Sequence, residues 1–247
     1  MKKVILVVVL ALFLVGGAFL GVHLFKEKVY LEKDVKCDFD DGICYDVKGK
    51  PITGRIVAYE NEVLLSDISY VDGKEDGVLK IYRNDGKIYL EGTYSKGKPN
   101  GYVKEYNEDG SIHSYDEFVN GEQHGKSIIY QAQNKVLKEW YYNMGKDVGV
   151  GRVFYENGKP QLEINFDLGE LKYYFDNGSV QTVAHFNDSG YNGDWTIYDI
   201  DGKITAELVY ENGVGKSGYC LKNDGSKAEF NEEAFIDFAK NNRTPCD

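Results

Sequence analysis

The chain has 247 residues, of which 42% are hydrophobic and 28% charged, a composition typical of globular rather than disordered proteins. Its formal net charge of −11 argues against DNA, RNA or anionic lipid as the main partner, because each of these is bound through accumulated lysine and arginine. The chain contains 28 glycines, 4 prolines and 20 tyrosines. Such a composition favours many short strands joined by glycine turns.

An uncharged apolar run of 22 residues spans positions 4 to 25. At about 1.5 Å per residue, a helix of this length can cross a hydrocarbon core of about 30 Å. Two alternatives are open, an uncleaved membrane anchor and a secretory signal cleaved after Ala18. The anchor is favoured because the apolar run continues for seven residues beyond Ala18. We therefore expect residues 1–28 to form an N-terminal membrane anchor or signal peptide.

The four cysteines form two groups at opposite ends of the remaining chain, Cys37 with Cys44 and Cys220 with Cys246. An even number of cysteines outside the apolar run fits an oxidising compartment. Four cysteines allow three connectivities, of which we favour Cys37–Cys44 and Cys220–Cys246. Residues 1–28 carry four lysines and one glutamate, so the part that would lie beyond the membrane carries a net charge of −14.

A repeat of about 24 residues runs through the rest of the chain. Most copies begin with a glycine followed five residues later by a tyrosine: Gly54 and Tyr59, Gly77 and Tyr82, Gly101 and Tyr106, Gly125 and Tyr130, Gly169 and Tyr174, Gly193 and Tyr198. A copy that starts near Gly149, with Tyr155, is four residues short. An Asn-Gly or Asp-Gly pair follows most of these tyrosines, ending at Gly86, Gly110, Gly158, Gly178, Gly202 and Gly225.

Each copy is interpreted as one β-hairpin, because Asn-Gly and Asp-Gly allow the positive φ of a tight turn and apolar residues alternate with polar ones on either side. A lone hairpin is marginally stable, so successive copies must pair. The sequence therefore predicts an all-β fold, an elongated antiparallel meander of about seven to eight stacked hairpins over residues 54–229. A disulfide-stapled segment is expected at 29–53.

The last segment, residues 230–247, is expected to hold a short capping helix. Asn231 is a good N-cap, and Phe235, Phe238 and Ala239 form an apolar stripe. We expect this helix to close the open edge of the sheet. Alternatively, its stripe binds a partner.

The repeated hairpin resembles the bacterial variant of the MORN repeat, and the segment from Tyr45 to Gly54 resembles the start of the YwqK-type antitoxin family. The resemblance covers about residues 45 to 225. It implies a bacterial protein that neutralises a toxin by direct binding. The sequence departs from the family pattern in the short copy near Gly149, in Asn134 at a turn-glycine position and in Leu221 at the last tyrosine position.

The seven repeat tyrosines share one phase and are expected to stack along one face as the core of the array. Several aromatic residues, including Tyr141, fall outside this phase and are expected on the opposite, exposed face. Exposed tyrosine and tryptophan make good anchors for a protein interface. The expected partner contacts are Trp140, Tyr142, Tyr173 and Trp195.

The sequence contains no catalytic, nucleotide-binding or metal-binding motif among those sought, so we expect no catalytic residue, no metal and no cofactor. The expected function is that of a non-enzymatic, protein-binding repeat protein, anchored in the bacterial cell membrane with its repeats outside the cytoplasm, or secreted if the first segment is cleaved. Its partner would be another protein, and a basic toxin would suit the acidic surface. The alternative is an envelope scaffold or surface-exposed structural protein without a toxin partner.

Overall fold

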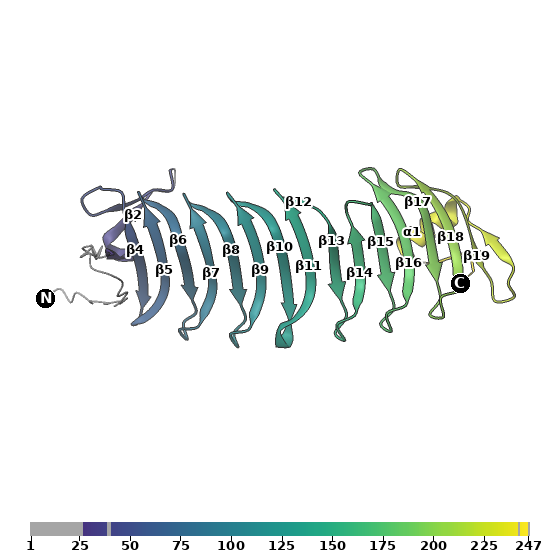
Figure 1. Cartoon of the computed structure of the whole chain (residues 1–247), viewed down its shortest axis with the longest axis horizontal. Coiled ribbons are helices and arrows are strands. Elements are labelled where there is room, and N and C mark those ends of the chain that lie inside the picture. Colours follow the sequence, from purple (N-terminus) through teal and green to yellow (C-terminus); the bar gives the residue numbers. More distant parts are fainter. Residues whose placement is uncertain (1–26, 39–40, 242, 247) are drawn as a thin grey trace, which may run out of the picture.

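The computed structural model describes residues 27–38, 41–241 and 243–246, and within them the chain forms a long open sheet of 18 strands (Figure 1). One α-helix, α1 (Glu232–Asn241), and a separate pair of short strands, β2 (Val35–Cys37) and β3 (Cys44–Asp46), complete the architecture. The predicted meander of hairpins is therefore confirmed. The expected membrane segment at 4–25 lies outside the described residues, and the helix that is described is too short to cross a bilayer.

The strands of the long sheet pair in chain order, each antiparallel to the next, except that β1 lies parallel to β4 at one edge. Strands β12 and β13 both pair with β11 and together take the place of one strand. The strands are β1 (Val29–Leu31), β4 (Gly54–Glu60), β5 (Val63–Val71), β6 (Lys74–Tyr82), β7 (Ile88–Ser95), β8 (Lys98–Tyr106), β9 (Ile112–Val119), β10 (Glu122–Gln131), β11 (Lys135–Asn143), β12 (Lys146–Asp147), β13 (Val150–Phe154), β14 (Pro160–Asn165), β15 (Glu170–Tyr174), β16 (Val180–Asn187), β17 (Gly190–Tyr198), β18 (Ile204–Glu211), β19 (Val214–Leu221) and β20 (Lys227–Glu229).

The Asn-Gly and Asp-Gly pairs close hairpins, as predicted. Between β6 and β7, the backbone N–H of Gly86 donates to the carbonyl of Arg83 at 2.8 Å, and Gly86 has a φ of +81°. The Asp85 carboxylate accepts the backbone N–H of Lys87 at 3.0 Å. Asn134, which takes the place of a turn glycine, has a φ of +57°, a conformation that asparagine tolerates better than most residues.

At the opposite ends of the strands, several hairpins close with two-residue turns in which both residues have positive φ, as at Asn120 (+52°) and Gly121 (+90°). This geometry matches the twist of the flanking strands. Each such turn also binds the copy before it. The N–H of Gly97 donates to the carbonyl of Glu75 at 2.8 Å, and Gly121 donates in the same way to Pro99. Successive copies are therefore joined by backbone hydrogen bonds beyond those of strand pairing.

The short copy arises because one hairpin has a single glycine at this end of the strands, where the other copies have two. Regular copies have a turn glycine and, four residues later, a start glycine, whereas Gly169 serves as both. Here the N–H of Phe186 donates to the carbonyl of Gly169 at 2.7 Å, and a Cβ at position 169 would collide with the carbonyl of Phe186. The 20-residue spacing therefore follows from a hairpin turn without the usual four-residue extension.

One face of the sheet, which we call the aromatic face, is defined by two rows that cross the strands. The first contains Ile56, Ile68, Leu79, Gly92, Val103, Asp116, Ser127, Trp140, Gly151, Ile164, Leu171, Ala184, Trp195, Leu208 and Gly218. The second contains Tyr70, Tyr94, Phe118, Tyr142, Phe166, Phe186 and Tyr210. Side chains alternate along a strand, so the residues between these positions point to the other face.

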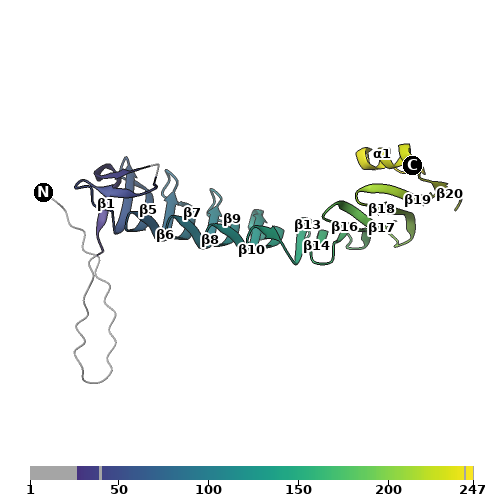
Figure 2. The ribbon, with the colours of Figure 1, turned by 90° about the horizontal axis from the view of Figure 1, so that it is seen from above.

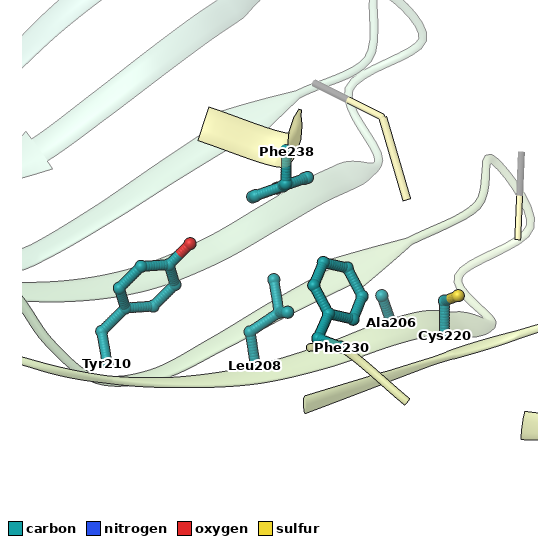
Figure 3. Packing of buried hydrophobic residues seen from close by; sticks show 6 residues of the cluster. All are labelled: Ala206, Leu208, Tyr210, Cys220, Phe230 and Phe238. Carbon is teal, nitrogen blue, oxygen red and sulfur yellow. The ribbon is translucent and has the colours of Figure 1, made fainter. Parts of the chain in front are cut away.

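Both ends of the aromatic face are covered by the chain itself. At the N-terminal end, Ile52 is fully buried and packs with Cys44 against Ile56 and Tyr70. At the C-terminal end, α1 lies over one side of the sheet (Figure 2), and Phe238 points from it toward the strands (Figure 3). The disulfides Cys37–Cys44 and Cys220–Cys246 fix these two caps, in the pairing that we favoured.

The position of α1 corrects one expectation. The predicted N-cap is present, since the Asn231 carboxamide accepts the backbone N–H of Ala234 at 2.8 Å. The apolar stripe, however, packs on the face of the sheet rather than along its edge strand, with Phe238 centred 5.5 Å from Trp195 and Phe235 centred 5.7 Å from Tyr210. The aromatic residues of β17 and β18 attract the stripe because they offer far more apolar area than the short edge strand β20.

Candidate protein-binding face

The side of the sheet opposite to the aromatic face carries a row of charged side chains of alternating sign, and we call it the charged face. Its central row contains Asp67, Lys80, Glu91, Lys104, Tyr115, Ile128, Glu139, Arg152, Glu163, Lys172, Val183, Thr196, Glu207, Tyr219 and Glu229. Cross-strand pairs of opposite charge stabilise a sheet by about 0.2–1 kcal/mol each.

Ion pairs run along most of this face. Lys126 Nζ lies 2.5 Å from Glu139 Oε1, and Arg152 Nε lies 3.1 Å from Glu163 Oε2. The hydrogen bond from Lys126 is the main cause that lowers the pKa of the Glu139 carboxyl from its usual value. The charged face thus satisfies many of its own charges and is an unsuitable surface for a partner that must bring compensating charge.

Six of the seven repeat tyrosines lie on the charged face, which corrects the expectation that they form the core. Each of the six follows by five residues a start glycine of the aromatic face, so it points to the opposite side. Tyr155 follows Gly149 by six residues and lies just beyond β13, where Phe154 takes the phase of the other tyrosines. The hydroxyl of Tyr106 donates to Glu91 at 2.9 Å, on the charged face. Six of the seven are half-buried, and Tyr59 is 56% exposed. The buried clusters instead lie at the two ends of the aromatic face.

The aromatic face between the caps has no covering layer among the described residues, and its side chains are mostly half-buried. Tyr94, Phe118, Tyr142 and Phe166 recur there on every second strand. The rings of Trp140 and Phe166 meet edge to face with their centroids 5.6 Å apart. Ring contacts of this kind restrict the rotamers of the side chains, so the aromatic rings of this face are held in fixed positions.

The four predicted contact residues, Trp140, Tyr142, Tyr173 and Trp195, all lie on the aromatic face, but with different exposure. Tyr173 is 38% exposed. Trp140 is only 8% exposed, which contradicts the expectation of an exposed side chain, because glycine at position 151 lets its ring lie flat on the neighbouring strand. Trp195 is half-buried beneath α1.

Tyr141 also differs from its expectation. It was expected on the face opposite to the repeat tyrosines, yet it lies with them on the charged face. Its hydroxyl donates to Glu139 at 3.2 Å, and Lys126 Nζ is 6.0 Å from the centre of its ring. Adjacent residues of a strand point to opposite faces, so Tyr141 and Tyr142 cannot share one.

A groove of about 1080 Å³ lies where the open part of the aromatic face meets the C-terminal cap. Tyr173, Trp195, Tyr210 and Phe238 are among its lining residues. The indole Nε1 of Trp195 is buried and has no hydrogen-bond partner in the described part of the chain. The groove is continuous with the open face at Tyr173, so both can contribute to one binding surface.

Four acidic side chains on the aromatic face form no ion pair among the described residues, whereas most of those in the central row of the charged face do. They are Glu75, Glu105, Asp116 and Asp147. Asp116 accepts a hydrogen bond from the Gln123 carboxamide at 3.2 Å. Lys138 of β11 also lies on the aromatic face, two residues before Trp140, with its Nζ 4.3 Å from the centre of the Trp140 ring.

The charged row was missed at the sequence level, although a signal for it exists. The third residue after a start glycine is basic at Lys80, Lys104, Arg152 and Lys172, and the third residue before the aromatic of the second row is acidic at Asp67, Glu91, Glu139, Glu163 and Glu207. These two phases are the cross-strand neighbours of one row. A search for charge at fixed phase in the repeat would have found them.

No cluster of three or more histidine, cysteine, aspartate or glutamate side chains able to hold a metal ion occurs in the described ranges. Two segments, residues 147–168 and 167–188, match the MORN repeat variant. These are the short copy and the one after it, and for them the likeness to the MORN repeat variant is confirmed. No curated protein matches the chain.

Proposed function

We propose that this chain is a non-enzymatic protein-binding repeat protein whose binding surface is the open aromatic face between the two caps. One observation carries the proposal. The chain covers both ends of an apolar face with its own segments, and none of the residues that the structure describes covers the middle, from Tyr94 to Tyr173. Aromatic rings gathered on one open face are typical of a surface that binds another protein. Hydrogen bonds within and between the copies hold it rigid, which lowers the entropic cost of binding.

Two further parts of the proposal come from the sequence. Residues 4–25 anchor the chain in a membrane, with the repeats outside the cytoplasm, and the two disulfides support an oxidising compartment. The partner is a toxin that the repeats neutralise by covering it, as the likeness to MORN-variant antitoxins implies. If the partner is instead a structural component of the envelope, this chain acts as a scaffold that binds it through the same face.

The test uses a photo-crosslinking amino acid placed in the full chain. Tyr173, 38% exposed on the aromatic face, and Tyr89, 39% exposed on the charged face, form a matched pair of positions. We expect the substituted Tyr173 to form a specific adduct in cells and the substituted Tyr89 to form none. Equal adducts at both positions, or none at either, would contradict the proposal.

The identity of the adduct separates the two cellular roles. A crosslinked protein that stops growth when it is expressed alone, and no longer does so with this chain, supports neutralisation of a toxin. A crosslinked envelope protein without such toxicity supports the scaffold.

A further inference from the structure

Two of the carboxylates without an ion pair are neighbours of the second aromatic row, and a third lies in the first row. Glu75 is the cross-strand neighbour of Tyr70, and Asp147 is the cross-strand neighbour of Tyr142. Asp116 lies two strands before Trp140 in the first row. Glu75 lies where the N-terminal cap meets the open face, since it neighbours the capped Tyr70 and its charge acts on Tyr94. From this border to β12, aromatic rings and carboxylates lie side by side.

These carboxylates are close enough to the tyrosine rings to shift the pKa of their hydroxyls. Burial raises the pKa of the Tyr142 hydroxyl, and the charges of Asp147 and Asp116 raise it further. Burial and then the charge of Glu75 raise the pKa of Tyr94. Burial also raises the pKa of the Glu75 carboxyl itself, so part of its hydration is already lost. A group in this state gains when a cation approaches.

Aromatic faces beside carboxylates select a cationic partner for two reasons. A lysine or arginine head binds over a tyrosine or phenylalanine ring, and it forms a charge-assisted hydrogen bond with a carboxylate. The chain uses the first contact itself, since Lys138 lies over the ring of Trp140. Two copies packed through this face would instead bring their carboxylates together, which disfavours self-association.

We infer that the aromatic face from Glu75 to Asp147 binds a lysine- or arginine-bearing segment of a partner protein, with the cations placed over the second aromatic row and against its carboxylates. This inference rests on the proposed protein-binding function and names the chemistry of its partner. The rings of the row recur on every second strand, about 10 Å apart at about 4.8 Å per strand. A segment in the polyproline II conformation advances about 3.1 Å per residue with three residues per turn, so one cation in every three residues would face the sheet at about this spacing.

The probe is therefore a fluorescein-labelled peptide of five Lys-Leu-Ser repeats, with a peptide of five Glu-Leu-Ser repeats as its charge-reversed counterpart. Binding to the full chain in non-ionic detergent is measured by fluorescence anisotropy. We expect the lysine peptide to bind, the glutamate peptide not to bind, and the affinity for the lysine peptide to fall with rising salt.

Two double variants with the same change in net charge make the test specific. E75Q/D147N removes two carboxylates of the aromatic face. E108Q/D188N removes two exposed carboxylates outside that face, for whose side chains no ion pair is formed in the described structure. Loss of two nearby charges should lower the affinity for the lysine peptide by about tenfold in E75Q/D147N. The affinity should change little in E108Q/D188N. Circular dichroism checks that both variants are folded.

Equal weakening in both variants would show that the peptide responds only to total charge and would overturn the inference, as would unchanged affinity in E75Q/D147N or equal binding of the glutamate peptide. These failures differ from failure of the proposed function. If a partner crosslinks at Tyr173 but the lysine peptide fails the test, only the inference that the partner is basic is refuted. Absence of a crosslink at Tyr173 removes the proposed function as well.

Discussion

Substitution of Gly151 by alanine tests whether the packing of Trp140 holds the middle of the sheet. The backbone of Gly151 does not have a positive φ, so alanine fits its conformation. A Cβ at this position would lie 2.8 Å from three atoms of the Trp140 ring. Carbon atoms prefer a separation of about 3.5–4.0 Å, so the indole must move by roughly 0.7 Å or more. The ring has little room, because it is 8% exposed and meets Phe166.

The expected magnitude follows from two opposing contributions. Overpacking of this kind costs about 1–3 kcal/mol. Replacing glycine by alanine at a compatible backbone position stabilises by about 0.4–1 kcal/mol through the unfolded state. We therefore expect Gly151→Ala to lower the free energy of unfolding by about 1–2 kcal/mol. In a Trp140→Val background the obstacle is gone, and the same substitution should be neutral or stabilising.

Urea unfolding followed by far-ultraviolet circular dichroism gives the four free energies of this double-mutant cycle. Hydrogen exchange of β11 and β13 shows whether the loss is local to these strands, as expected for an array in which each copy contacts only its neighbours. A coupling energy of about 1–3 kcal/mol is expected between the two positions. The same cost for Gly151→Ala in both backgrounds would refute the assignment of this contact.

Two further predictions concern the ends of the array and its charged face. Because the Cys220–Cys246 disulfide closes a loop over a sequence separation of 26, Cys246→Ser should destabilise the C-terminal cap by about 3–4 kcal/mol, measured as lost hydrogen-exchange protection of α1 with β8 and β9 unchanged. Protection of α1 that persists would contradict this. Burial and the hydrogen bond to Glu91 raise the pKa of Tyr106 from 10.0 to about 12, so its contribution to stability should be present below pH 10 and lost as the pH rises toward 12. Tyr106→Phe should flatten the pH dependence of the urea midpoint in this range, and an unchanged slope would count against it.

The hairpins, their turns and the C-terminal helix could be predicted from the sequence because local chemistry determines each of them. Positive φ at Gly86 and at Asn134 follows from residue types that tolerate it. The Asn231 N-cap directly precedes the helix that it begins. These features need no knowledge of which distant segment lies nearby, and so a single repeat unit is enough to reveal them.

The faces of the sheet could not be assigned in the same way. Phase in the repeat places Tyr106 and Tyr94 on opposite sides, but it does not say which side is covered. That choice is made by Ile52 and Phe238, which come from segments outside the repeats and both pack on the side of Tyr94. The number of tyrosines at one phase suggested a core, whereas hydroxyls that reach carboxylates of a charged row suit a half-exposed position better.

The open face and the stability of the sheet are compatible for a physical reason. In a single layer, neither face can be buried by a second sheet, so strand pairing and contacts between successive copies must supply most of the stability. The charged face contributes ion pairs such as Arg152 with Glu163, and the turns contribute bonds such as that from Gly121 to Pro99. None of these contacts uses the middle of the aromatic face. The half-buried rings of that face can therefore contact a partner while Trp140 stays packed in the fold. Carboxylates without an ion pair can be kept there at little expense to the sheet, because half-exposed charges retain part of their hydration.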